Sequence, residues 1–132
     1  MIRRSGENIS ALEVEACLSL NPNIGQVAVT AVPDEIRGDE VFASVVLKDV
    51  DSKQNPAQLE QLATSIFSGA ATQLAYYKLP GYIAFVNELP LTASNKPQRA
   101  ELKKMAHAIV AELDQQATCF DLRSQKKKTV NS

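Results

Sequence analysis

Val27-Ala28-Val29-Thr30-Ala31-Val32 is followed, after a polar connection, by Val41-Phe42-Ala43-Ser44-Val45-Val46-Leu47. β-Branched residues are frequent in both stretches, which is typical of strands. Apolar residues fall on both faces of each stretch, so the pattern predicts strands that are covered on each side. Residues 33–40 are rich in turn formers and are predicted as a loop. A third strand is expected over residues 82–86.

Three helices are predicted around these strands. Ser10-Ala11-Leu12-Glu13 has the form of a capping box, in which the Ser10 hydroxyl accepts from the third helical amide and Glu13 reaches back. It opens a helix over residues 10–20, buried through Val14, Cys17 and Leu18. Asn55-Pro56 opens a second helix and Pro97 a third. Their apolar residues recur in helical steps, at Leu59, Leu62, Ala63, Ile66, Phe67, Ala70 and Leu74, and at Leu102, Met105, Ala106, Ile109 and Leu113.

Together these elements predict one small α+β domain, with a sheet of about three main strands and helices packed on it. The 132 residues, 45% of them hydrophobic, are enough for a single core. No apolar run is long enough to span a bilayer. The first residues lack the apolar stretch of a signal peptide, which favours a cytoplasmic setting. Cys17 and Cys119 are predicted to be free thiols rather than a disulfide.

Charge and chemistry exclude several functions. The net charge of −1 argues against a dedicated nucleic-acid binder. Residues 96–132 nevertheless carry 8 basic and 4 acidic groups, and Lys126-Lys127-Lys128 is expected to be a solvated tail. The single histidine, His107, lies off the apolar stripe of its helix and is expected to be exposed. Nucleophilic triads, metal-ligand spacings and glycine-rich nucleotide loops are all missing from the sequence.

Lys96 is the remaining candidate for chemistry. It lies in a polar segment, residues 89–99, that leads directly into the predicted start of the last helix. A lysine there is a mobile charge, and the first-turn amides add partial positive charge, so the position favours phosphate or carboxylate. Judged on these grounds alone, an ordinary surface lysine is the more common explanation.

Five segments, in order and spacing, resemble the C-terminal domain of AMP-forming acyl-CoA synthetases. Ile2-Arg3-Arg4-Ser5-Gly6-Glu7-Asn8-Ile9-Ser10 with Glu13-Val14-Glu15 resembles "RRxGENIxxxEVE". Residues 29–40 are similar to "AVVGVPDExxGE", and residues 43–47 to "AFVVL". Tyr77-Lys78-Leu79-Pro80 with residues 85–90 resembles "YKxPxxIxFVxELP", and residues 92–99 resemble "TxSGKxxR". The resemblance covers residues 2–103, so residues 1–104 are interpreted as this domain and 105–132 as a helix end and basic tail.

The resemblance implies a function. Enzymes of this family use ATP, with which Mg²⁺ is expected, to convert a carboxylic acid into an acyl-adenylate, and then transfer the acyl group to coenzyme A. A large N-terminal adenylation domain binds ATP and the acid, and the C-terminal domain is a lid that serves both steps. Lys96 matches the lysine of adenylation, Gly6 lies where the pantetheine arm runs, and Tyr77 matches a position that contacts the CoA adenine. We expect no ligand to be held by this domain alone, and the isolated chain to be inactive.

Alternatives stay open at two of these residues, and the sequence departs from the family's motifs elsewhere. Gly6 is also explained as a turn glycine and Tyr77 as a packing tyrosine. Asn95 stands where the family has glycine, although asparagine tolerates left-handed backbone angles. Leu79 and Gly81 replace residues that are basic in some relatives. The hinge residue of the family would precede Ile2, so we expect the chain to be part of a longer protein.

Two other functions compete with the ligase domain. One is a freestanding interaction module that binds CoA, a carrier protein or a partner synthetase domain. The other, less favoured, is nucleic-acid binding through residues 96–128, which would be salt-sensitive. The acid itself is left open, because the lid does not line the acyl pocket in this family.

Overall fold

The computed structural model describes residues 2–4, 7–34, 38–48, 56–74, 78–86, 88–94, 98–112 and 119–122. Within them the chain forms one mixed sheet and three helices, which confirms the predicted α+β class. The elements follow one another as β1 (Ile2–Arg4), β2 (Glu7–Ile9), α1 (Ala11–Leu18), β3 (Ile24–Asp34), β4 (Gly38–Leu47), α2 (Pro56–Ala71), β5 (Tyr82–Phe85), α3 (Arg99–Ala111) and β6 (Cys119–Asp121).

β4 is the central strand of the sheet. Antiparallel β3 pairs with it from Ile24↔Leu47 to Asp34↔Gly38, over the whole length of β4. On its other edge, β5 runs parallel to the second half of β4, and β1 meets its first residue through Arg4↔Gly38. β2 extends the sheet beyond β1, and β6 extends it beyond β5, both as antiparallel neighbours. The three predicted strands are therefore confirmed as β3, β4 and β5.

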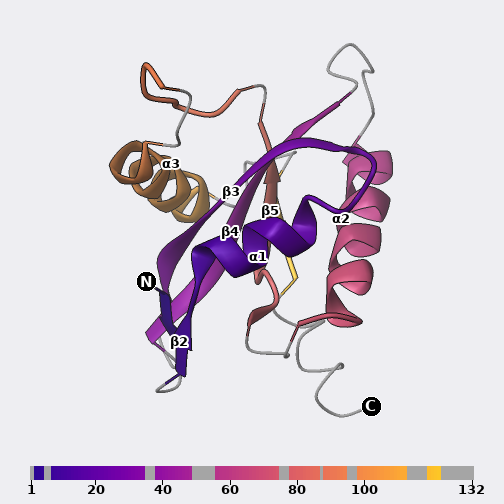
Figure 1. Cartoon of the computed structure of the whole chain (residues 1–132), viewed down its shortest axis with the longest axis horizontal. Helices are drawn as coiled ribbons and strands as arrows, with labels where there is room; N and C mark the ends of the chain where they lie inside the picture. Colours follow the sequence, from indigo (N-terminus) through magenta and orange to yellow (C-terminus); the bar gives the residue numbers. More distant parts are fainter. Residues whose placement is uncertain are drawn as a thin grey trace.

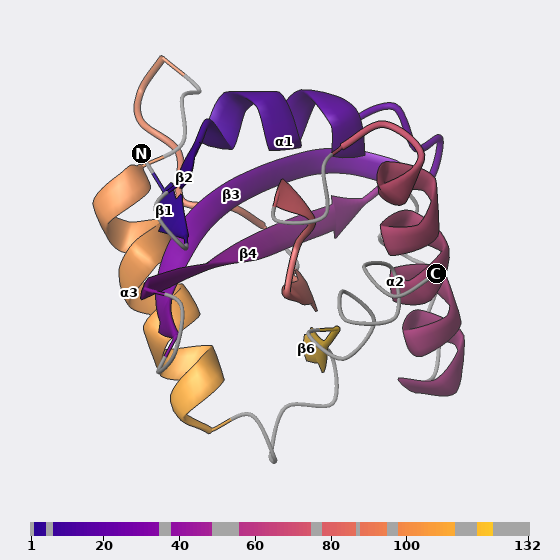
Figure 2. The same ribbon diagram turned by 90° about the horizontal axis from the view of Figure 1, so that it is seen from below.

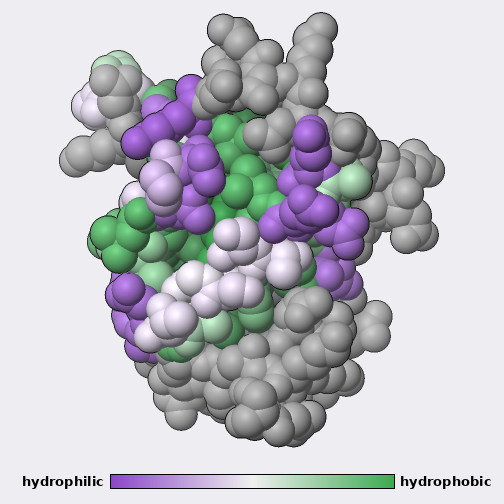
Figure 3. Space-filling view, turned by 90° about the vertical axis from the view of Figure 1, so that its right-hand side faces the viewer, coloured by the Kyte–Doolittle hydropathy of each residue, from purple (hydrophilic) through white to green (hydrophobic). Residues whose placement is uncertain are grey.

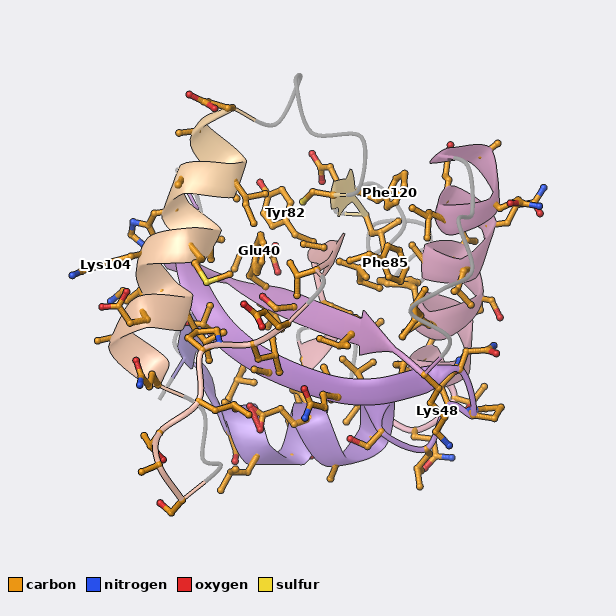
Figure 4. The ribbon with its side chains drawn as sticks, turned by 90° about the horizontal axis from the view of Figure 1, so that it is seen from above. Glu40, Lys48, Tyr82, Phe85, Lys104 and Phe120 are labelled. Atoms are coloured by element: carbon orange, nitrogen blue, oxygen red, sulfur yellow. The ribbon has the colours of Figure 1, made fainter. Side chains whose placement is uncertain are left out.

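Helices cover both faces of the sheet, as the apolar pattern predicts. Val41, Ala43 and Val45 of β4 pack in one apolar cluster with residues of α1 and α2. The alternate residues Phe42 and Val46 belong to clusters that include α3. Figures 1 and 2 show β3 and β4 passing between α3 on one side and α2 on the other. In Figure 4, Phe85 and Phe120 point toward α2, with ring centroids 6.1 Å apart.

The helix predictions agree with the structure except at one contact. The Ser10 hydroxyl accepts from the Glu13 amide at 3.4 Å, so the first half of the capping box is present. The Glu13 carboxylate, however, does not turn back to the cap but accepts from Lys78. Val14 and Leu18 are buried and Cys17 is half-buried. The predicted apolar residues of α2 and α3 belong to the core clusters, except Met105, which is half-buried outside them, and Leu113, which lies outside the described residues.

The polar connection predicted over residues 33–40 is wrong at both ends. β3 continues to Asp34 and β4 begins at Gly38, so this segment is mostly a continuation of the β3–β4 ladder. Pro33 is tolerated because β3 pairs with no strand on its other edge among the described residues, so its missing amide breaks no ladder bond. The three-residue strands β1, β2 and β6 extend the sheet beyond the three main strands, and segments this short show no alternating pattern in the sequence.

Glu40, predicted in that loop, is instead fully buried on the α3 side of the sheet. Its Oε1 accepts from the Val41 amide at 2.9 Å, and its side chain lies between the sheet and α3 in Figure 4. Gly81 packs directly against this side chain. A Cβ atom at position 81 would overlap the Glu40 carboxyl group. The glycine at position 81 therefore makes room for a buried carboxylate.

We predict that Gly81→Ala destabilises the domain by about 1–3 kcal/mol, the usual effect of overpacking a filled core. The matched control is Gly69→Ala, because Gly69 is exposed near the end of α2 and a Cβ there meets nothing within 4 Å. Alanine favours the helix over glycine, so this variant should be unchanged or more stable by about 0.5–1 kcal/mol. Urea unfolding of both variants measures the difference. Equal stability of the two variants would contradict the packing of Gly81 against Glu40.

Candidate functional site

The two ends of the segment that contains Lys96 are anchored to the rest of the fold. Leu89 is buried on the α3 side of the sheet with Ala28, Val46 and Leu102. The Gln98 amide donates to the carbonyl of Pro90 at 2.9 Å. The Gln98 side chain donates through Nε2 to the carbonyl of Leu91 at 3.0 Å. The two ends of the segment are thus joined to each other and held on the core.

Two exposed hydroxyl groups lie inside that segment. The Oγ1 of Thr92 and the Oγ of Ser94 are 3.2 Å apart. Lys96, two residues beyond Ser94, lies outside the described residues. On the far side, Gln98 occupies the N-cap of α3, and its side chain makes no cap bond because it serves Leu91 instead. The segment therefore ends at a helix start whose first amides are not satisfied by the cap side chain.

Gly6 also lies outside the described residues, but the strands on both sides of it are described. β1 and β2 pair as Ile2↔Ile9, Arg3↔Asn8 and Arg4↔Glu7. Only Ser5 and Gly6 therefore separate the paired Arg4 and Glu7 in the sequence. Two-residue connections between antiparallel strands favour glycine, because their backbone angles often require positive φ. This position is compatible with the turn role expected of Gly6.

Tyr77, the third predicted residue, lies outside the described residues as well, whereas Lys78 beside it is well defined. The Lys78 ammonium is 2.9 and 3.1 Å from the two carboxylate oxygens of Glu13. Leu79 and Pro80, which follow, are both buried. Sequence reasoning missed this ion pair, because its partners are 65 residues apart and nothing in the local pattern connects them.

The described flanks of the candidate residues lie in two different regions. In Figure 1, residues 88–94 form the loop at the upper left, beyond α3, whereas the β1–β2 hairpin lies at the lower left. The flank of Tyr77 is joined to α1 through Lys78 and Glu13. The structure thus keeps the neighbourhood of Lys96 apart from the neighbourhood of Gly6.

A groove lies between the end of α1 and the last turns of α2, away from both regions. Its volume is about 290 Å³, and Cys17, Leu20, Ile66 and Thr72 are among the residues that line it. The space-filling view of the α2 side shows apolar side chains exposed between hydrophilic ones (Figure 3). None of the lining residues that the structure describes is Lys, Arg, Asp or Glu. This described part of the lining therefore carries no charge for a nucleotide phosphate.

The two cysteines and the histidine agree with the sequence predictions. Cys17 and Cys119 are free, as predicted. His107 is exposed on α3. Within the described ranges, no group of three or more His, Cys, Asp and Glu side chains is arranged to hold a metal ion. Among the helices described, none is long and apolar enough to cross a bilayer.

Comparison with known proteins identifies the family. Residues 13–96 match the model of the AMP-binding enzyme C-terminal domain. The chain belongs to this family. The matched region ends at Lys96 and includes Tyr77, whereas Gly6 precedes it.

Similar proteins include acyl-CoA synthetases and ligases. The chain is 40% identical over 104 residues to the mitochondrial acyl-coenzyme A synthetase ACSM3 of Homo sapiens, covering 79% of this chain and 17% of that protein. It is 39% identical over 111 residues to the uncharacterized acyl-CoA ligase YtcI of Bacillus subtilis (strain 168), covering 84% of this chain and 20% of the relative. The chain thus spans about a fifth of the length of such relatives.

Solved structures agree with this assignment. A crystal structure of the anthranilate CoA ligase AuaEII, in complex with anthranoyl-AMP, matches with a TM-score of 0.73 and 35% identity, over 84% of this chain and 20% of that one. A Brucella canis acyl-CoA synthetase matches with a TM-score of 0.68 and 33% identity, over 86% of this chain and 19% of that one. The fold is that of the C-terminal domain of adenylate-forming enzymes.

We predict that the two thiols of this domain differ in reactivity. Burial, and to a lesser degree the Asp121 carboxylate, raises the pKa of Cys119 to about 12. Burial and the Glu13 carboxylate also raise the pKa of Cys17, which is less enclosed. Because the thiolate is the nucleophile, iodoacetamide near pH 8 should alkylate Cys17 before Cys119 in the folded chain and both alike in urea. Peptide mass spectrometry measures the two rates.

The same pKa shift has a consequence for stability. A pKa raised in the folded state means that the neutral thiol stabilises the fold below about pH 9, and that this contribution is lost as pH rises toward about 12. The free energy of unfolding should therefore decline over that range, and less steeply in Cys119→Ala. Equal alkylation of the two thiols in the folded chain, or identical pH profiles, would contradict the burial of Cys119.

Proposed function

We propose that this domain supplies the adenylation lysine, Lys96, and part of the coenzyme A channel to an AMP-forming acid–CoA ligase. The observation that carries the proposal is the match of residues 13–96 to the family, which ends at Lys96. The anchoring of the Lys96 segment supports it, because Gln98 joins the two ends of that segment through Pro90 and Leu91. A charge that must enter a partner's active site needs a segment whose ends are anchored in this way, since small errors of position are costly in catalysis.

The chemistry of the first step explains why a lysine is sufficient. A carboxylate oxygen of the acid attacks the α-phosphorus of ATP, and the bond to pyrophosphate breaks. Both reactants are anions, so their approach is unfavourable. The Lys96 ammonium, placed between the carboxylate and the α-phosphate, offsets this repulsion and stabilises the charge of the transition state. The step transfers no proton, so it needs no general base such as a histidine.

The second step uses another region of the domain. The sulfur of coenzyme A attacks the carbonyl carbon of the acyl-adenylate, the thiol loses its proton, and AMP leaves. We place Gly6 beside the pantetheine arm, where the lack of a side chain permits close approach. We place Tyr77 against the CoA adenine. The separation of the β1–β2 hairpin from the loop before α3 supports two faces, each used in one step.

The domain is proposed to act only with a larger module. Its relatives are more than four times as long, so the pockets for ATP and the acid are expected in the remaining part. We expect Mg²⁺ to arrive with ATP in that module. The isolated chain is accordingly expected not to form acyl-CoA.

The first test is Lys96→Ala in the full-length ligase that contains this chain. We expect the rate of adenylation, measured by exchange of labelled pyrophosphate into ATP, to fall by about 100-fold or more, because the repulsion of the two anions is no longer offset. Transfer from preformed acyl-adenylate to CoA should largely persist, because Lys96 then lies away from the site.

Lys104→Ala is the matched control for this test. Lys104 is exposed on the next turns of α3 and pairs with Glu101 within that helix, and it points outward in Figure 4. The variant removes the same charge without touching the proposed site, so both steps should be unchanged. An equal loss of both steps in Lys96→Ala, or a similar loss in Lys104→Ala, would contradict the role of Lys96.

The second test is Gly6→Leu in the same ligase. The added side chain should obstruct the pantetheine arm, so the CoA-dependent step should slow by about tenfold or more while pyrophosphate exchange is retained. Thermal unfolding of the variant checks that the hairpin still folds. Retention of the CoA-dependent step at full rate would contradict the place of Gly6 in the channel.

A further inference from the structure

We infer that Glu13 and Lys78 form a positioning pair for the coenzyme A step. The inference rests on the proposed function, since it assumes that Gly6 and Tyr77 face CoA. It adds two residues for which the comparisons give no role. Neither is proposed to contact the substrate; their role is to hold two distant segments at a set distance.

The geometry of the pair is that of a specific contact. The Lys78 ammonium donates to both carboxylate oxygens of Glu13, at 2.9 and 3.1 Å. The Lys78 side chain is 21% exposed and that of Glu13 45% exposed, so the pair is partly shielded from water. By comparison, Lys104 and Glu101 on α3 are 3.7 Å apart, more exposed, and only three positions apart. A single helix brings those two together, whereas the tertiary fold brings Glu13 to Lys78.

The residues that follow Lys78 attach it to the core and to β4. The next residue, Leu79, is fully buried. The Gly81 amide donates to the carbonyl of Val41 at 2.9 Å, which attaches this turn to β4. Lys78 is the first described residue after Tyr77. Its contact with Glu13 therefore fixes the position of the residue that directly follows Tyr77.

Glu13 is held by α1, the helix that directly follows the β1–β2 hairpin. It lies in the first turn of α1, four residues after Ile9, the last residue of β2. Glu15 of the same helix accepts from the Val29 amide at 3.0 Å, which holds α1 on β3. Among the described residues the hairpin pairs with β4 at Arg4↔Gly38. Only Ser10 separates β2 from α1 in the sequence, so α1 is a second attachment of the hairpin, and Glu13 links that attachment to Lys78.

The consequence is a link between the two elements proposed to face CoA. Ser5 and Gly6 follow β1, and Tyr77 precedes Lys78, so the ion pair connects the hairpin to the adenine-facing segment. A partly exposed pair contributes little to the stability of a fold. Its effect on a bound substrate that touches both segments is larger, because binding needs both to be preorganised.

The test is carried out in the full-length ligase with Glu13→Gln and Lys78→Met. Each keeps the approximate length of its side chain and removes the charge. We expect the KM for CoA in the thioester step to rise about fivefold, or about 1 kcal/mol, with pyrophosphate exchange unchanged. Lys78 takes part in at least one further interaction, so Glu13→Gln is the cleaner variant. Lys104→Met, which breaks the pair within α3, is the matched control and should leave the KM for CoA unaltered.

The double exchange Glu13→Lys with Lys78→Glu separates positioning from simple loss of structure. It restores the attraction with the charges reversed, so its KM for CoA should lie closer to the wild-type value than that of Glu13→Lys alone. Three results would overturn the inference: an unchanged KM in both single variants, an equal fall in pyrophosphate exchange and CoA transfer, or no recovery in the double variant. If any of these results occurs while Lys96→Ala and Gly6→Leu have the effects predicted above, the inference fails and the proposed function stands.

Discussion

The burial of β4 on both faces and its pairing on both edges hold the domain together. β3 pairs along one edge of β4, while β5 and β1 share the other. Residues 41–46 are all buried, because α1 and α2 cover one face and α3 covers the other. Hydrogen bonds and apolar contacts thus converge on one strand of ten residues. Every segment with a proposed function is attached, directly or through one neighbour, to this strand.

This construction is compatible with the two reactions proposed for one small domain. Its centre is closely packed, and the buried carboxylate of Glu40 against Gly81 shows how little room is left. The residues proposed to carry the chemistry belong to segments at the margins, whose ends are held by the core. Gln98 holds the segment of Lys96, and the Glu13–Lys78 pair joins the hairpin of Gly6 to the flank of Tyr77. A rigid body with two separate margins can present either one to a larger module by rotation as a whole.

Much of this arrangement was predictable from the sequence, for identifiable reasons. The helical stripes of α2 and α3 and the two-sided apolar strands agree with the structure, because burial imposes a period on the residues. The prediction of a loop over residues 33–40 is wrong, because the ladder between β3 and β4 outweighs the turn-forming residues. The predicted contact of the Glu13 side chain with the helix cap is wrong, because the carboxylate accepts from the Lys78 ammonium instead. Lys96, Gly6 and Tyr77 are proposed from motifs alone, and the structure describes their flanks rather than the residues themselves.

By itself the sequence determined the fold class, the buried faces of the helices and the family, since each is carried by local periodicity or by short motifs in a set order. Only the tertiary structure decided that Glu40 is buried, that Glu13 joins Lys78, and that Gln98 joins the two ends of the Lys96 segment. Such contacts depend on which segments the sheet brings together. A charged side chain has the same sequence signature whether its partner is water or a residue 65 positions away.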